Sequence, residues 1–201
     1  MANHSSHSLV TPIYGALVNV DFDYFTTAAV PTAPTSLDTE VSKDGGTYAD
    51  ATNEVTLFKE VGGVTDSPAG YLTLTAAEMT ADLVYVQSKS ANCVARMACI
   101  RPCRLTTVRA STLAGSADTS HVQLDGSASA VDDFYNGLWI RTDANTGAGQ
   151  ARRILDYVGS TKVATLETAL ETAVDNTTTF TIGFVENQAV NAFRLDDLQS
   201  N

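Results

Sequence analysis

Residues 18–25 read VNVDFDYF, a segment in which apolar and polar side chains alternate almost without interruption. Successive side chains of a β-strand point to opposite faces, so this alternation predicts a strand with one buried and one wet face. Short strand-like runs recur at residues 54–61, 70–75 and 82–88. They are separated by turn-forming sequences such as DGG at 44–46 and SPAG at 67–70, and no long stripe has a helical period. The sequence therefore predicts an all-β protein.

The strand pattern breaks at residues 101–104, which read RPCR. Proline cannot donate the hydrogen bond that a central strand requires, so this segment is expected to be a joint. Before it, about seven short strands in residues 16–104 predict an antiparallel β-sandwich. After it, residues 105–186 predict a small β-barrel or sheet, because closure or stacking protects open strand edges. Residues 1–15 and 187–201 fit neither pattern and are expected to be extended N- and C-terminal arms.

Composition excludes several classes of protein. The chain has 201 residues, 23 acidic and 12 basic, and a formal net charge of -11, which argues against nucleic-acid binding. Its 44% hydrophobic content is too high for a disordered chain. No apolar stretch approaches the length of roughly 20 residues that crosses a bilayer, and the first residues lack a secretory pattern. We expect a protein made in the cytoplasm, with no membrane and no nucleic-acid partner.

Apolar residues in the two arms need a surface to pack on, because such short segments are unstable alone in water. The bases also gather near the joint, while the flanking regions are acidic, which would suit contact between the middle of one subunit and acidic surface on another. An equally good interpretation of the bases is that they face solvent from strands. The predicted assembly interface consists of Leu9, Ile13, Tyr14, Arg96, Arg101, Arg104, Phe193, Leu195 and Leu198.

Metal sites are not expected from the residue spacing. Cys93, Cys99 and Cys103 have the spacing C-x5-C-x3-C, whereas zinc sites favour C-x2-C pairs. Asp143, Asn145 and Gly147 resemble the start of a calcium loop. An EF-hand requires glutamate at the twelfth position, which is Ile154 here. The sequence predicts no metal, no cofactor and free thiols.

No catalytic constellation can be argued from the sequence either. Asp132 and Asp133 are adjacent, so their side chains diverge, and we interpret them as turn caps. The glycine-bearing loop 146–153 lacks the Lys-Ser/Thr pair and following helix of a phosphate loop, so Gly147 and Gly149 are expected to permit positive φ in a turn. His121 is the one candidate base for a cysteine nucleophile outside the N-terminal segment. The sequence therefore predicts a protein that is not an enzyme.

Two parts of the chain resemble modules of tailed-bacteriophage structural proteins. The motif DDFYNG at 132–137, followed by TGAGQARRILDY at 146–157 and TKVATL at 161–166, is similar to a small β module of such virions. LDTEVSKDGGTYAD at 37–50 and GYLTLTAAEMTAD at 70–82 resemble an Ig-like sandwich module of phage accessory and tail proteins. The resemblance implies an Ig-like β-sandwich followed by a small β domain, and it implies no catalytic residues.

We therefore expect a non-enzymatic virion protein, made in the host cytoplasm, whose partners are other virion proteins such as the major capsid protein or tail proteins. The favoured role is a trimeric capsid decoration or cement protein that stabilises the head. The alternative is a tail, baseplate or fibre-anchoring protein. A further alternative is a host-glycan-binding module, although its single tryptophan, Trp139, lies in a strand context typical of core residues.

Overall fold

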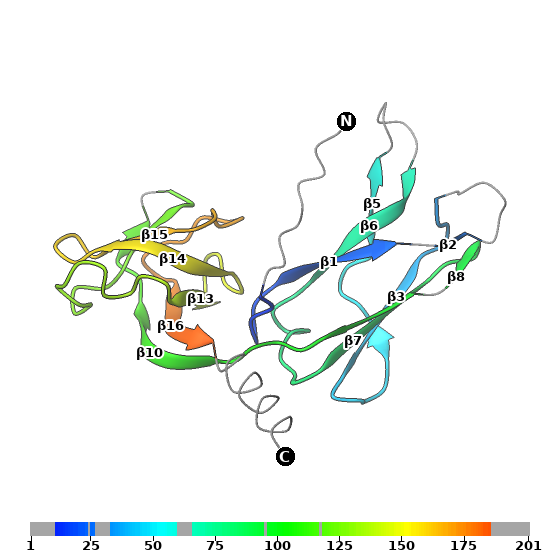
Figure 1. The fold of residues 1–201 in the computed structure, drawn as a ribbon, viewed down its shortest axis with the longest axis horizontal. Coiled ribbons are helices and arrows are strands. Elements are labelled where there is room, and N and C mark those ends of the chain that lie inside the picture. Colours follow the sequence, from blue (N-terminus) through cyan, green and yellow to red (C-terminus); the bar gives the residue numbers. More distant parts are fainter. Residues whose placement is uncertain are drawn as a thin grey trace, which may run out of the picture. The chain divides into compact units, whose positions relative to one another are not determined.

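The computed structural model describes residues 11–23, 25–26, 33–59, 66–94, 96–116 and 118–185. The described residues form β-strands and no helix, which confirms the all-β class (Figure 1). The chain divides into two compact units, with the division between Pro102 and Cys103. Each unit is described below by itself.

The first unit contains three antiparallel sheets. The three-stranded sheet has the order β1 (Val18–Asp23), β6 (Asp66–Leu74), β5 (Thr56–Lys59). The four-stranded sheet has the order β4 (Ala49–Asp50), β3 (Asp38–Lys43), β7 (Val84–Lys89), β9 (Arg96–Ile100). A short pair joins β2 (Phe25–Thr26) to β8 (Cys93–Val94).

The core of the first unit is built from both larger sheets. Strands β1 and β6 contribute Val18, Leu72 and Leu74, while β3 and β7 contribute Val41, Val84 and Val86. Strand β7 alternates buried and half-buried residues along its whole length, as expected for a strand with one face in the core. The unit is thus sandwich-like. The finer Ig-like topology stays a prediction.

The turn predicted at residues 67–70 is wrong, because these residues lie inside β6. Strand β6 pairs with β1 only from Ala69 onward, and its register with β5 shifts between Leu57 and Lys59. Pro68 therefore lies at the irregular part of the pairing with β5, and it lies outside the part of β6 that pairs with β1. A proline without an N–H is tolerated at such a position, which the dipeptide pattern alone does not reveal.

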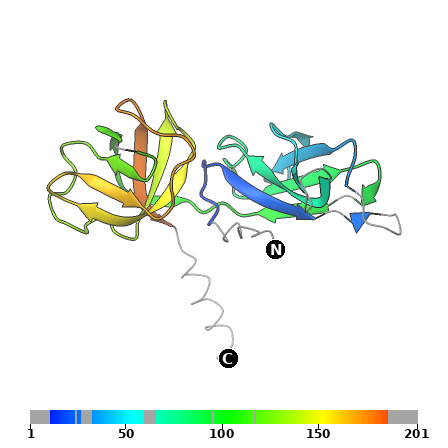
Figure 2. The same cartoon turned by 90° about the horizontal axis from the view of Figure 1, so that it is seen from above.

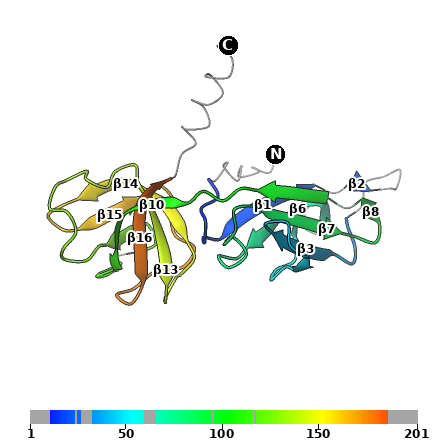
Figure 3. The same cartoon turned by 90° about the horizontal axis from the view of Figure 1, so that it is seen from below.

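The described residues of the second unit form one seven-stranded antiparallel sheet, drawn in Figure 2 and Figure 3. Its strand order is β10 (Leu105–Thr112), β16 (Thr179–Val185), β13 (Trp139–Ala144), β14 (Ala151–Val158), β15 (Val163–Leu166), β12 (His121–Gln123), β11 (Gly115–Ser116). The predicted hairpin around residues 158–161 is confirmed, because β14 pairs with β15.

The sheet of the second unit is not a closed barrel, which corrects the barrel half of the prediction. Its two edge strands, β10 and β11, lie at opposite ends of this order and do not pair with each other among the described residues. Between them, the Leu113 amide donates to the Thr178 carbonyl and the Ala114 amide donates to the Gln123 carbonyl. One extended segment thus bonds to both ends of the sheet without a strand ladder that closes it.

The core of the second unit is a single cluster of apolar side chains. Its large members include Tyr135, Tyr157 and Phe180, and the rings of Tyr135 and Tyr157 meet edge to face with centroids 4.8 Å apart. The hydroxyl of Tyr157 donates to the Ser129 carbonyl at 2.7 Å, so this polar atom is satisfied inside the core.

Candidate assembly surface

The residues predicted to form an assembly interface do not come together as one described surface. Leu9, Phe193, Leu195 and Leu198 lie outside the described residues. Ile13 is only 3% exposed, so its side chain belongs to the interior rather than to an exposed arm. Tyr14 is half-buried, and Arg101 and Arg104 are exposed. Arg96 lies in β9, and nothing is described of its side chain.

Two other bases, which lie near the joint in sequence, each form an ion pair within their own unit. Lys89 Nζ lies 2.7 Å from Glu40 Oε2 and 3.6 Å from Asp38 Oδ2 on the neighbouring strand. Arg109 Nε lies 3.1 Å from Asp125 Oδ2, and a second guanidinium nitrogen contacts Oδ1. The Arg109 guanidinium holds the pKa of Asp125 well below its usual range. These two bases are therefore occupied within the chain, whereas Arg101 forms no ion pair with the described residues.

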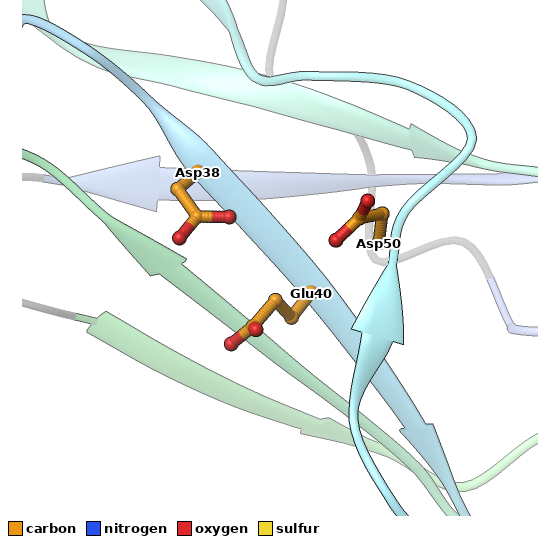
Figure 4. Close-up of side chains that lie close together, drawn as sticks. All are labelled: Asp38, Glu40 and Asp50. Carbon is orange, nitrogen blue, oxygen red and sulfur yellow. The ribbon is translucent and has the colours of Figure 1, made fainter.

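Asp38, Glu40 and Asp50 place carboxylate oxygens within 4.8 Å of one another, the one such group found among the described residues (Figure 4). Asp38 and Glu40 lie on β3 and Asp50 on β4. Lys89 contacts two of the three carboxylates, so a cation already lies beside the group. With three carboxylates and one ammonium, the group keeps a net negative charge on this edge of the sheet.

The DDFYNG motif forms a structural turn. Asp132 Oδ1 accepts a hydrogen bond from the Gly159 amide at 2.8 Å, and Asp133 Oδ1 accepts one from Asn136 Nδ2 at 2.7 Å. The two carboxylates thus bind different partners, as expected of turn caps rather than of a catalytic pair. Gly137 has a φ of 80°, which closes the turn as the Asn-Gly pair predicts.

The glycine-bearing loop is a turn held by the side chain of Gln150. Gly147 and Gly149 have φ values of 68° and 84°, which confirms the expected positive φ. The Gln150 side chain is buried, and its Nε2 donates to the carbonyls of Gly147 and Thr172 at 2.7 and 2.9 Å. Its Oε1 accepts from the amides of Glu171 and Thr172 at 2.7 and 3.1 Å. All four hydrogen-bonding positions of the amide are therefore used.

The residues that resemble a calcium loop bind protein groups instead. Asp143 Oδ1 accepts from Arg141 Nε at 2.6 Å, and its Oδ2 accepts from the Thr181 hydroxyl at 2.7 Å. Asn145 Nδ2 donates to the Thr177 carbonyl at 2.8 Å. The side chain of Asp143 thus links its loop to β16, and the side chain of Asn145 links the same loop to the segment that precedes β16.

Asp175 lies in the same loop network and accepts hydrogen bonds from the amide and the hydroxyl of Thr177. Hydrogen bonds from the Thr146 hydroxyl, and then from the hydroxyl and amide of Thr177, lower its pKa from 3.8 to about 2. Because the pKa of Asp175 is lower in the folded state, ionised Asp175 contributes fully to the stability of the fold above pH 3.8. This contribution is lost as the pH falls toward 2. We expect a carboxyl-carbon NMR titration to show this midpoint and Thr146→Val to move it back up. A wild-type midpoint at or above 3.8 would contradict the assignment.

The three cysteines differ in how far they are buried. Cys93 is buried, Cys99 is exposed and Cys103 is half-buried, and burial raises the pKa of the Cys103 thiol. His121 Nδ1 lies 2.9 Å from Asp118 Oδ1. The imidazole of His121 therefore has a carboxylate partner of its own.

Four exposed apolar side chains come from two adjacent segments of the second unit. The Asp133 amide donates to the Tyr157 carbonyl and the Gly137 amide to the Ile154 carbonyl, so residues 131–138 lie alongside the end of β14. We call the four residues from these segments the Phe134 surface: Val131 (63% exposed), Phe134 (54%), Leu155 (62%) and Val158 (38%). Grouped exposed apolar residues mark contact sites more often than single ones do.

The sequence pattern does not indicate the Phe134 surface. An apolar residue in a strand pattern is normally assigned to the core, and residue type alone does not distinguish the exceptions. The register shift between Ile154 and Asp156 places Leu155 at an irregularity of β14, which the alternating pattern does not show.

Comparisons with known proteins identify no family. No protein-family model matches the chain, and the searches of curated proteins and of solved structures also gave no match. Among the described residues, no helix has the length and apolar character to cross a membrane.

Trp139 is half-buried in β13, between Gly183 and Arg153 on the neighbouring strands.

Proposed function

We propose that the chain is a non-enzymatic structural protein of a tailed-phage virion, most simply a decoration or cement protein that binds the capsid from outside. The observation that carries this proposal is the Phe134 surface on the folded β unit. The polar side chains of the sequence motifs, including Asp132, Asp133 and Gln150, bind other parts of the same unit. They support a folded scaffold and leave the exposed apolar residues as the groups available to a partner.

The resemblance of the two sequence modules to phage structural proteins supports the same proposal. Acidic composition suits a component that faces away from packaged DNA, since its charge of -11 repels phosphate. Virion location, homotrimeric assembly and contact with the major capsid protein are parts of this proposal. A tail, baseplate or fibre-anchoring role is the second candidate, because the same modules are similar to tail proteins.

The experiment adds purified protein to phage particles that lack it, followed by sedimentation of the particles and imaging. Binding of hundreds of copies to the head supports a cement protein. Binding of a few to dozens of copies at the tail supports the second candidate. A protein that binds no part of the particle overturns both.

Two substitutions test whether the Phe134 surface is the contact. We expect Phe134→Glu combined with Leu155→Glu to reduce particle binding at least about tenfold, because charge would be buried in an apolar interface. Both side chains are more than half exposed, so the melting temperature should stay near that of the wild type. Phe184→Glu is the matched control, since Phe184 is 51% exposed but lies on β16. Equal binding by the double variant and the wild type would exclude this surface.

A further inference from the structure

The Phe134 surface contains an aromatic anchor that is supported from below. The ring of Phe134 meets the ring of Tyr135 edge to face, with centroids 4.9 Å apart, and Tyr135 is only 3% exposed. Tyr135 belongs to the core of the second unit, so the exposed Phe134 ring is packed against the interior on one side. A ring that is already packed loses little side-chain freedom when a partner covers it, which makes it a favourable anchor for binding.

The segments of the Phe134 surface also carry acidic side chains. Residues 131–138 and 154–158 together contain three acidic residues and no basic residue. The three are Asp132, Asp133 and Asp156, and all of them are exposed. The hydrogen bond from the Asp133 amide to the Tyr157 carbonyl places Asp133 beside the residue that follows Asp156. The exposed apolar side chains therefore share these two segments with negative charge.

Two bases beside these segments do not cancel that charge. Lys162 is half-buried, and its Nζ donates to the Ser129 carbonyl at 3.0 Å. Arg153 donates from Nε to the Gly137 carbonyl at 3.3 Å, and its Nη1 lies 4.0 Å from Glu167 Oε1. Since Glu167 offsets Arg153, Lys162 alone opposes the three carboxylates. The Phe134 surface therefore keeps a net negative charge.

We infer that the Phe134 surface binds a partner protein whose own contact surface is apolar and basic. The Phe134 ring packs against apolar side chains of the partner, and arginine or lysine side chains of the partner lie opposite Asp133 and Asp156. This inference rests on the proposed function for the location of the site, and it adds the chemistry of the partner. A second copy of the same surface fits less well, because two copies would bring like charges together.

Association kinetics test the contribution of charge, because salt screens charge while apolar anchors act mainly on dissociation. The purified full chain is passed over immobilised phage particles that lack it, at salt from about 20 mM to about 500 mM. We expect Asp133→Asn combined with Asp156→Asn to slow association at least about threefold at low salt and to match the wild type at high salt. Asparagine at position 133 tolerates the φ of 63° there and keeps an oxygen that can accept from Asn136.

The matched control is Asp38→Asn combined with Asp50→Asn, which removes the same charge from the first unit and should associate at the wild-type rate. Equal association rates for the two double variants would overturn the inference and leave the proposed function standing. Self-association of the purified chain that strengthens with salt and is lost in Phe134→Glu would also overturn it, because the surface would then belong to a second copy.

A pair of peptides tests the partner chemistry without phage particles. Amide chemical shifts of the isotope-labelled full chain are recorded with a peptide of alternating leucine and arginine, and with one of alternating leucine and glutamate. We expect shifts at residues 131–134 and 155–158 with the basic peptide, and binding at least about tenfold weaker for the acidic one. Equal binding of the two peptides, or no shifts there with the basic one, overturns the inference even if particles bind. These shifts without any binding to particles would support the inferred chemistry and overturn the proposed function.

Discussion

Replacement of Gln150 by leucine should lower the free energy of unfolding of the second unit by roughly 3–4 kcal/mol. Leucine has a similar volume, so the loss comes from hydrogen bonds rather than from a cavity. The amides of Glu171 and Thr172 and the carbonyl of Thr172 would lose this partner together, while the Gly147 carbonyl would keep only the hydrogen bond from the Thr142 hydroxyl. Each buried polar group left without a partner costs about 1–3 kcal/mol, less where water reaches it.

The measurement is urea unfolding of the full chain followed by Trp139 fluorescence. Trp139 is the single tryptophan and lies in the second unit, so its signal reports that unit. Gln123→Leu is the matched control, because Gln123 is exposed and makes one bond of 3.3 Å to the Thr161 carbonyl. The control should change stability by less than about 1 kcal/mol. Similar losses in both variants would show that Gln150 has no special structural role.

Gln150→Glu separates hydrogen bonding from side-chain size. An ionised carboxylate can still accept from the amides of Glu171 and Thr172, but it faces the carbonyls of Gly147 and Thr172 without a donor. Protonation of the introduced carboxyl restores one donor, so its folded-state pKa should be raised. The stability deficit against wild type should therefore grow as the pH rises above about 4.3. A deficit that does not change with pH would contradict this.

Local patterns predicted the local parts of the fold. The alternation at 18–25 gave a strand at β1, the hairpin of β14 and β15 was expected around 158–161, and Asn136-Gly137 closed a turn as its residue types indicate. In the hairpin the partners of the backbone groups lie near in sequence, whereas the alternation indicated the strand at β1 although its partner β6 lies far along the chain. Residue type and spacing were then sufficient.

Features that depend on distant partners could not be predicted. Gln150 was part of a glycine-rich turn in sequence, but its side chain binds residues 21 and 22 positions further on. Pro68 indicated a turn, and only the registers with β1 and β5 show why a strand accepts it. The exposure of Phe134 and Leu155 follows from the segments beside them. The spacing of residues along the chain does not indicate any of these partners.

Gly159→Ala should destabilise the second unit by about 2–4 kcal/mol, because of a close approach rather than because of backbone conformation. In the hairpin VGSTK at 158–162, glycine is the residue type that adopts positive φ most readily. The residue with positive φ is instead Lys162, at 61°. A Cβ atom on Gly159 would lie 2.4 Å from the backbone carbon and oxygen of Ala130.

That contact is with backbone, so no side-chain rotation can relieve it. The segment at Ala130 would have to move, although Tyr157 and Lys162 both donate to the neighbouring Ser129 carbonyl. Movement would also strain the hydrogen bond from the Gly159 amide to Asp132. Gly126→Ala is the matched control, since a Cβ there meets no atom within 4 Å, and it should be neutral or stabilise by up to about 1 kcal/mol. If urea unfolding monitored by Trp139 gives equal stabilities for the two variants, the close approach at Gly159 does not constrain the fold.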